Sequence, residues 1–217
     1  MSTTGSAALA RGYRSVRENV TGWLTECPGA ADAPVPCCPG WSVRDVVAHL
    51  VDVCGRFGGL PGTGRPADDT GKLLTAWAEA AAPVERELGA GTAGTDGRAV
   101  MDAVTHECDI REALGIAPPV GHPGFGSAFR VVVGGLGASL GRHGLAAVTI
   151  KSPVDAWVAG QGEPGVTWSG GHYELLRALC GRRSHAQISA MAWSRAPEPW
   201  LPAFTWGPFF PPGTARP

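Results

Sequence analysis

The chain has 217 residues, of which 44% are apolar and 17% charged, and its formal net charge is -1. This balance is typical of a globular protein with a sizeable core, in one large domain or two small ones, and it excludes extended disorder. The near-neutral charge gives no reason to expect nucleic acid or an anionic membrane as a partner.

The N-terminal sequence shows no basic segment followed by an apolar one, so we expect no secretory signal. No stretch reaches the ~20 apolar residues that a membrane helix needs. The six cysteines include no C-x-x-C pair. In a chain with a large core and no secretory signal, we expect these cysteines to be reduced thiols and the protein to be cytoplasmic.

Four helices are expected in the first half of the chain. Their ranges are about 7–26, 41–57, 68–89 and 95–115. Ser42 is a favourable N-cap for the second helix, and Gly115 stops the fourth ahead of Pro118 and Pro119. Four helices joined by short or Gly-rich loops predict an antiparallel bundle over residues 1–119.

The pattern changes after Pro119. Three further helices are expected, over about residues 125–140, 172–181 and 184–193. Gly134, Gly135 and Gly137 weaken the first of them. The runs AAVTIK, DAWVAG and GVTW are rich in β-branched or aromatic residues between turn residues, which is typical of a small sheet. The sequence therefore predicts an α+β fold, with a small mixed α/β domain over residues 120–217.

The C-terminal tail, APEPWLPAFTWGPFFPPGTARP, is too rich in Pro for regular structure. Its aromatic side chains are too apolar to remain in water; they are Trp200, Phe204, Trp206, Phe209 and Phe210. We expect the tail to pack over the body of the protein or across a subunit contact. The sequence does not indicate an oligomeric state.

A group of metal-ligand residue types falls on two of the expected helices. His49 lies in the second helix, and Asp102 and His106 lie four residues apart in the fourth. Because a helix turns ~100° per residue, Asp102, His106 and Asp109 share one stripe. A carboxylate and an imidazole at this spacing can bind one metal ion, with His49 as the natural third ligand. Three ligands leave an open coordination position, as catalytic sites do.

The same spacing has a structural alternative. Asp and His four residues apart also form a hydrogen bond on a helix surface, and an isolated His beside an apolar face is usually structural. Spacing alone therefore permits a metal site without establishing one. Cys54 and Cys108 lie near the proposed ligands in the sequence, and we interpret both as packing residues.

Three segments resemble the mycothiol-dependent maleylpyruvate isomerase-like family. PGWSVRDVVAHL resembles the segment with the family's first ligand histidine, VTHECDIREALG its second motif, and ELLRALCGRRSHAQISAMAW the end of its C-terminal domain. The resemblance implies a DinB-like four-helix bundle that holds a divalent metal, usually zinc, and a sterol-carrier-like α/β domain. By position the ligands are His49, Asp102 and His106. Asp102 stands where the founding isomerase has Glu, so its side chain is one methylene shorter.

The resemblance also implies a function, an isomerase or thiol S-transferase that depends on a metal and on mycothiol and acts on a small electrophile. The alternative is a non-catalytic protein that binds a small molecule or a partner and keeps a vestigial metal site. Asp109 and Arg111 match the family's Asp-Ile-Arg and are candidate catalytic residues, although a buried salt bridge is an equal alternative. Arg182 and Arg183 are candidates for binding the cofactor or a carboxylate, with helix C-terminal charge as the alternative.

Overall fold

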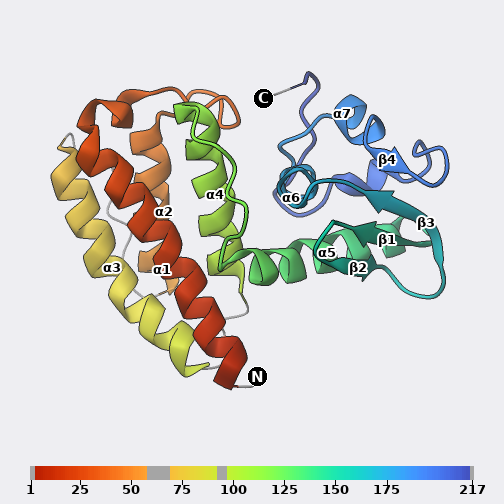
Figure 1. Cartoon of the computed structure of the whole chain (residues 1–217), viewed down its shortest axis with the longest axis horizontal. Helices are drawn as coiled ribbons and strands as arrows, with labels where there is room; N and C mark the ends of the chain where they lie inside the picture. Colours follow the sequence, from red (N-terminus) through yellow and green to blue (C-terminus); the bar gives the residue numbers. More distant parts are fainter. Residues whose placement is uncertain (1–2, 58–68, 92–96, 216–217) are drawn as a thin grey trace. The chain divides into compact units, whose positions relative to one another are not determined.

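The computed structural model describes residues 3–57, 69–91 and 97–215. The chain forms two compact units, residues 1–128 and 129–217. The first unit is helical and the second combines helices with a four-stranded mixed sheet (Figure 1). The α+β fold expected from the sequence is therefore confirmed. Within the described part of the chain, no helix is long and apolar enough to cross a membrane.

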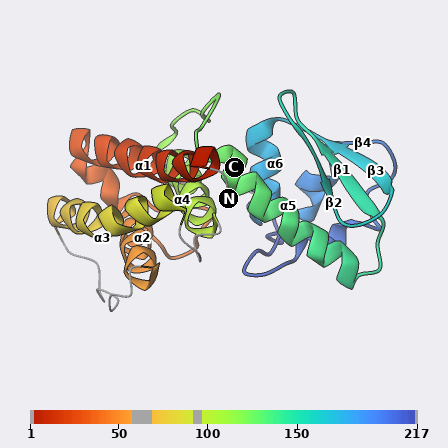
Figure 2. The same ribbon diagram turned by 90° about the horizontal axis from the view of Figure 1, so that it is seen from below.

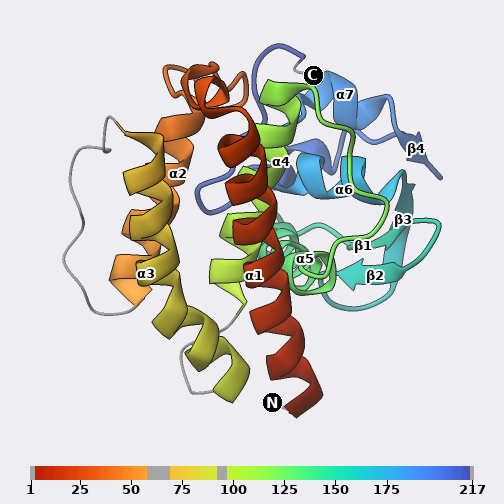
Figure 3. The ribbon, with the colours of Figure 1, turned by 60° about the vertical axis from the view of Figure 1, so that its left-hand side comes forward.

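The first unit is built from four long helices. They are α1 (Thr3–Glu26), α2 (Val43–Phe57), α3 (Thr70–Ala90) and α4 (Arg98–Leu114). Helices α1 and α2 each contact both α3 and α4, as Figure 3 shows. Their apolar faces meet in a core that includes the fully buried Trp77. The loop between α1 and α2 contains a short 3-10 helix, η1 (Pro28–Asp32), which the Pro-rich sequence did not reveal.

Local capping fixes where α2 and α3 begin. The Asp45 carboxylate accepts hydrogen bonds from the Ser42 hydroxyl and backbone N–H at 2.6 and 2.8 Å, and these bonds lower the pKa of Asp45. The Ser42 hydroxyl in turn accepts from the Asp45 N–H at 3.3 Å, which completes a reciprocal cap. Asp69 caps α3 by accepting from the Lys72 N–H at 2.8 Å.

The segment after Pro119 packs on the first unit before the second unit begins. The buried His122 lies 3.0 Å from Glu107 of α4. Gly124 approaches α1 so closely that a Cβ on Gly12 would lie 2.7 Å from its Cα. These contacts join the segment after Pro119 to the first compact unit, which extends to Ala128.

The second unit contains the sheet, in the order β2-β1-β3-β4. Its strands are β1 (Ala147–Lys151), β2 (Ala156–Ala159), β3 (Pro164–Ser169) and β4 (Ala192–Trp193). The β1–β3 pair is parallel, and the β1–β2 and β3–β4 pairs are antiparallel. Helix α5 (Phe125–Arg142) lies along the sheet (Figure 2). The ring of Phe129 in this helix stacks 4.3 Å from that of Trp157 in β2. Helix α6 (His172–Leu179) follows β3.

The helix predicted over residues 184–193 is wrong in its second half. Helix α7 (His185–Ser189) stops early, and the chain continues into β4. There Trp193 pairs with Trp168 of β3, and their rings stack 5.5 Å apart. This partner comes from a distant part of the sequence, so tertiary packing overrides the local helical pattern.

The Pro-rich tail packs on the second unit. This is the first of the two predicted arrangements, packing over the body of the protein. Phe204, in the 3-10 helix η2 (Leu201–Phe204), is buried with its ring 5.0 Å from that of Trp168. Phe209 is buried as well, whereas Phe210 is 63% exposed. The tail therefore closes part of the core of this unit.

The glycines that weaken α5 differ in their surroundings. A Cβ added to Gly137 would lie 2.7 Å from the backbone nitrogen of Gly160, whereas one added to Gly134 meets no described atom within 4 Å. We expect Gly137→Ala to destabilise the protein by about 1–3 kcal/mol, because backbone cannot move aside as a flexible side chain can. We expect the control, Gly134→Ala, to stabilise it by up to ~1 kcal/mol through helix propensity. Urea unfolding measures both, and equal stabilities would contradict the close approach.

Candidate functional site

Three side chains with metal-binding groups converge between α2 and α4. His49 Nε2 lies 3.6 Å from Asp102 Oδ2, and His106 Nε2 lies 3.8 Å from Asp102 Oδ1. The rings of the two histidines are 4.8 Å apart, and one donor atom of each residue lies within 4.8 Å of the others. The structure thus brings together the three residues that the sequence predicts as metal ligands.

The geometry of this cluster fits a metal ion. Both distances to Asp102 are longer than a hydrogen bond. A tetrahedral ion with bonds of ~2.0–2.2 Å separates its ligand atoms by roughly 3.3–3.6 Å. Among the described residues, His49 Nε2 is buried and has no hydrogen-bond partner. Burying a polar atom without a hydrogen-bond partner costs free energy, and a cation bound to Nε2 would supply the missing interaction.

Asp109 lies behind His106 on the same helix stripe. Its side chain has no exposed surface, and its Oδ2 lies 3.0 Å from His106 Nδ1. With the proton on Nδ1, this contact leaves Nε2, the nitrogen nearer Asp102, to bind a metal. A buried carboxylate in this position orients a ligand histidine. The structure gives Asp109 the geometry of a positioning residue, and its catalytic role stays a prediction.

His49 and Asp102 line a pocket of about 360 Å³. The rest of its lining combines apolar side chains with two cations, namely Val53, Phe57, Met101, Arg56 and Arg98. The two arginines could not be recognised from their residue type in the sequence, because each resembles an ordinary surface charge. The signal that could have found them is their spacing: Arg56 follows His49 by seven residues and Arg98 precedes Asp102 by four.

The cysteine on α2 is part of the packing behind the site. Cys54 Sγ lies 2.7 Å from Tyr13 OH, which also accepts a hydrogen bond from Trp77 Nε1 at 3.3 Å. Burial raises the pKa of the Cys54 thiol and that of the Tyr13 hydroxyl. Both groups are therefore protonated at neutral pH, so Cys54 is no ready nucleophile. This agrees with its interpretation as a packing residue.

Arg111 lies in an ion-pair network on another side of α4. Its Nε donates to Glu107 Oε1 at 2.9 Å, and its Nη1 donates to the Ala117 carbonyl at 3.0 Å. The guanidinium also lies 4.6 Å from the centre of the Trp23 ring. These contacts support the buried salt bridge that was the alternative for this residue, and the catalytic role of Arg111 stays a prediction.

Arg182 and Arg183 follow α6 in the second unit. Arg183 is buried and pairs with both oxygens of Glu174, at 2.7 and 3.0 Å. Arg182 donates to the Cys180 carbonyl at 2.8 Å, near the C-terminal end of α6. The Arg182 contact supports the alternative of a charge at a helix C-terminus, whereas Arg183 forms an ion pair with the first turn of α6. Binding of a cofactor by the two arginines stays a prediction.

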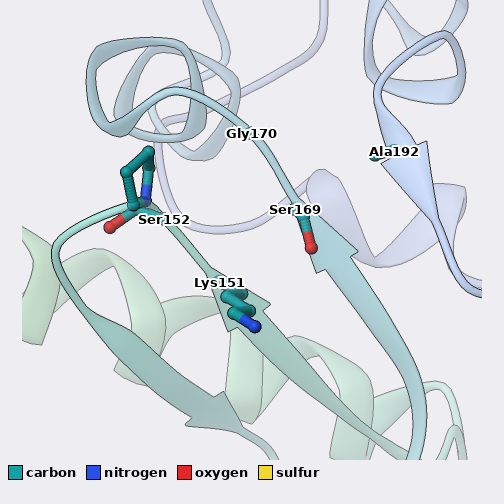
Figure 4. A pocket seen from close by; sticks show the side chains of 6 residues that line it. Lys151, Ser152, Ser169, Gly170 and Ala192 are labelled. Atoms are coloured by element: carbon teal, nitrogen blue, oxygen red, sulfur yellow. The ribbon is translucent and has the colours of Figure 1, made fainter.

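A pocket of about 460 Å³ lies in the second unit, where β1 and β3 end (Figure 4). Lys151 and Ser169 are partners in the parallel ladder and lie next to each other at this edge. The described lining supplies one ammonium group and the hydroxyls of Ser152 and Ser169. It includes neither Arg182 nor Arg183. The cluster of His49, Asp102 and His106 in the first unit therefore offers more groups that can bind a metal or transfer a proton than this pocket does.

Part of the sequence matches a known protein family. Residues 13–87 match the family described as mycothiol maleylpyruvate isomerase N-terminal domain. The match includes His49 and ends before Asp102 and His106. The family resemblance expected from the sequence is thereby confirmed. Among proteins with curated descriptions, none matches the chain.

Two solved structures share the fold. They are the mycothiol-dependent maleylpyruvate isomerase, with a TM-score of 0.50, and a variant of it in which a histidine is replaced by alanine, with a TM-score of 0.55. Each is 12% identical to this chain, and each alignment covers 90% of this chain and 94% of the other. At this identity the likeness shows the fold alone.

Proposed function

We propose that this chain, which has the N-terminal domain of the mycothiol maleylpyruvate isomerase family, is a metal- and mycothiol-dependent isomerase or thiol S-transferase. One observation carries the proposal: His49, Asp102 and His106 converge at a pocket, with Asp109 behind them. These three residues would hold a divalent ion, zinc in the first instance, and leave one position open. When bound, such an ion lowers the pKa of a coordinating thiol and so supplies a thiolate at neutral pH.

The protein's own residues would orient the reactants. Asp109 fixes the ring of His106, and the apolar wall formed by Val53, Phe57 and Met101 limits the access of water. Mycothiol, when bound as a thiolate, would supply a nucleophile for an activated double bond; addition would allow rotation about the resulting single bond, and elimination would regenerate the thiolate with no net consumption. With an electrophile that carries a leaving group, the thiolate would displace that group and mycothiol would be consumed.

The pocket also favours a class of substrate. Arg56 and Arg98 both line it, next to His49 and Asp102. Guanidinium groups bind carboxylates through paired hydrogen bonds, so the electrophile is expected to be small and anionic. Arg98 lies in the first turn of α4, where a cation opposes the helix dipole. Its position in the pocket lining would place a guanidinium beside a bound carboxylate.

The rival proposal is a non-catalytic binding protein with a vestigial metal site. The shorter side chain of Asp102 favours it, because a shorter carboxylate must approach the metal from a closer backbone. Against it, the Asp102 oxygens lie 3.6 and 3.8 Å from the two imidazole nitrogens. At that separation one ion can contact all three residues.

The experiment is turnover of a small unsaturated carboxylic acid by zinc-loaded and chelator-treated protein, with and without mycothiol. We expect turnover to require both zinc and mycothiol, because the described lining of the pocket contains no cysteine, serine or threonine side chain. The amide of the same acid is the matched substrate control, and its kcat/KM should be lower by about 10–100-fold if the arginines bind the carboxylate. Equal turnover without mycothiol would contradict the proposal, and zinc binding with no turnover would favour the rival.

A further inference from the structure

A second group of donor atoms lies against the opposite edge of the His106 ring. Cys38 Sγ donates a hydrogen bond to Asp109 Oδ2 over 3.6 Å, and the same oxygen lies 3.0 Å from His106 Nδ1. One donor atom each of Cys38, His106 and Asp109 lies within 4.8 Å of the other two. The first cluster faces Nε2 of this ring and the second faces Nδ1, so the two share His106 and no other residue.

The loop before α2 holds Cys38 in place. The Cys38 N–H donates to the Val35 carbonyl at 3.0 Å, and the Trp41 N–H donates to the Cys38 carbonyl at 2.9 Å. The neighbouring thiol has a different partner, because Cys37 donates to Glu112 at 3.0 Å. Cys38 is therefore positioned by its backbone, and the two adjacent thiols are directed at different carboxylates of α4.

We propose that Cys38, His106 and Asp109 form a second metal position, suited to zinc or another thiophilic divalent ion. Thiolate, imidazole and carboxylate are the three ligand types that zinc takes in proteins. The separation of 3.6 Å between Sγ and Oδ2 already fits a tetrahedral ion, and the 3.0 Å between Nδ1 and Oδ2 needs to open by a few tenths of an ångström. Binding at the second position releases the thiol proton to solvent. The ring proton moves from Nδ1 to Nε2 when the first position is empty, and it is released as well when an ion of the first position already holds Nε2.

The second position has a consequence for the first. An ion bound to Nδ1 replaces the contact through which Asp109 orients His106. Filling the second position therefore disturbs the histidine that the first position uses, and the two compete when metal is limiting. Cys38 is partly exposed, which gives an ion in solution a route to the buried Asp109.

Titration of the full chain with cobalt(II), followed by absorption, tests the second position. The wild type is expected to bind about two cobalt ions and to show a thiolate-to-cobalt charge-transfer band in the near ultraviolet. Cys38→Ser should lose this band and one equivalent of cobalt. The matched control, Cys37→Ser, changes the adjacent thiol and should keep both. Asp102→Ala, which affects the first position alone, should keep the band.

Three results would overturn the second position: a wild type without the band, a band that survives in Cys38→Ser, or a band lost in Cys37→Ser alone. If Cys38→Ser fails to fold, alkylation of Cys38 in the wild type replaces it. Saturating cobalt should then slow that reaction, and an unchanged rate would equally overturn the proposal. None of these readouts uses mycothiol or turnover, so a failure here is distinct from a failure of the proposed function.

Discussion

Replacing His106 by alanine is expected to reduce the zinc content of the protein from about one ion per chain, at stoichiometric zinc, to nearly none. His106 is the most buried of the three proposed ligands, with 11% of its side chain exposed. The variant keeps only His49 and Asp102, which are too few to hold a divalent ion against water. It also removes the ligand shared with Cys38, so the ion has no adjacent position to occupy. Elemental analysis after dialysis measures the loss.

Two further variants provide a control and an intermediate effect for comparison with His106→Ala. His143→Ala removes an exposed histidine of the second unit and should leave the zinc content unchanged. Asp109→Ala keeps the three ligands but loses the orientation of His106, so zinc affinity should fall by ~10–100-fold without vanishing. Full zinc content in His106→Ala would contradict the ligand assignment, and an unaltered affinity in Asp109→Ala would contradict its positioning role.

The helices of the first unit could be predicted because their signals are local. The caps at Ser42 and Asp69 and the stop at Gly115 depend on neighbours within a few residues, and the structure uses all three. Strand β4 could not be predicted in this way. Its partner, Trp168, lies 25 positions before Trp193, and no local pattern contains that information.

The candidate site shows the same division. Asp102, His106 and Asp109 lie on one helix, so their shared stripe follows from helical geometry alone. Cys38 belongs to an irregular loop, and its approach to Asp109 depends on turns that the spacing of the cysteines does not encode. Helical periodicity therefore predicts which ligands share a helix face, whereas a ligand that a loop supplies can be identified only from the tertiary structure.

The most direct test of the central claim is whether mycothiol coordinates a metal held by His49, Asp102 and His106. Cobalt-loaded Cys38→Ser protein is the appropriate form, because it lacks the thiol of the second position and so shows no thiolate band of its own. Addition of mycothiol is expected to produce a thiolate-to-cobalt band and to release one proton per thiol bound, since coordination deprotonates the thiol. The same addition to the metal-free protein is the control. An absorption spectrum that stays unchanged at saturating mycothiol would contradict the account.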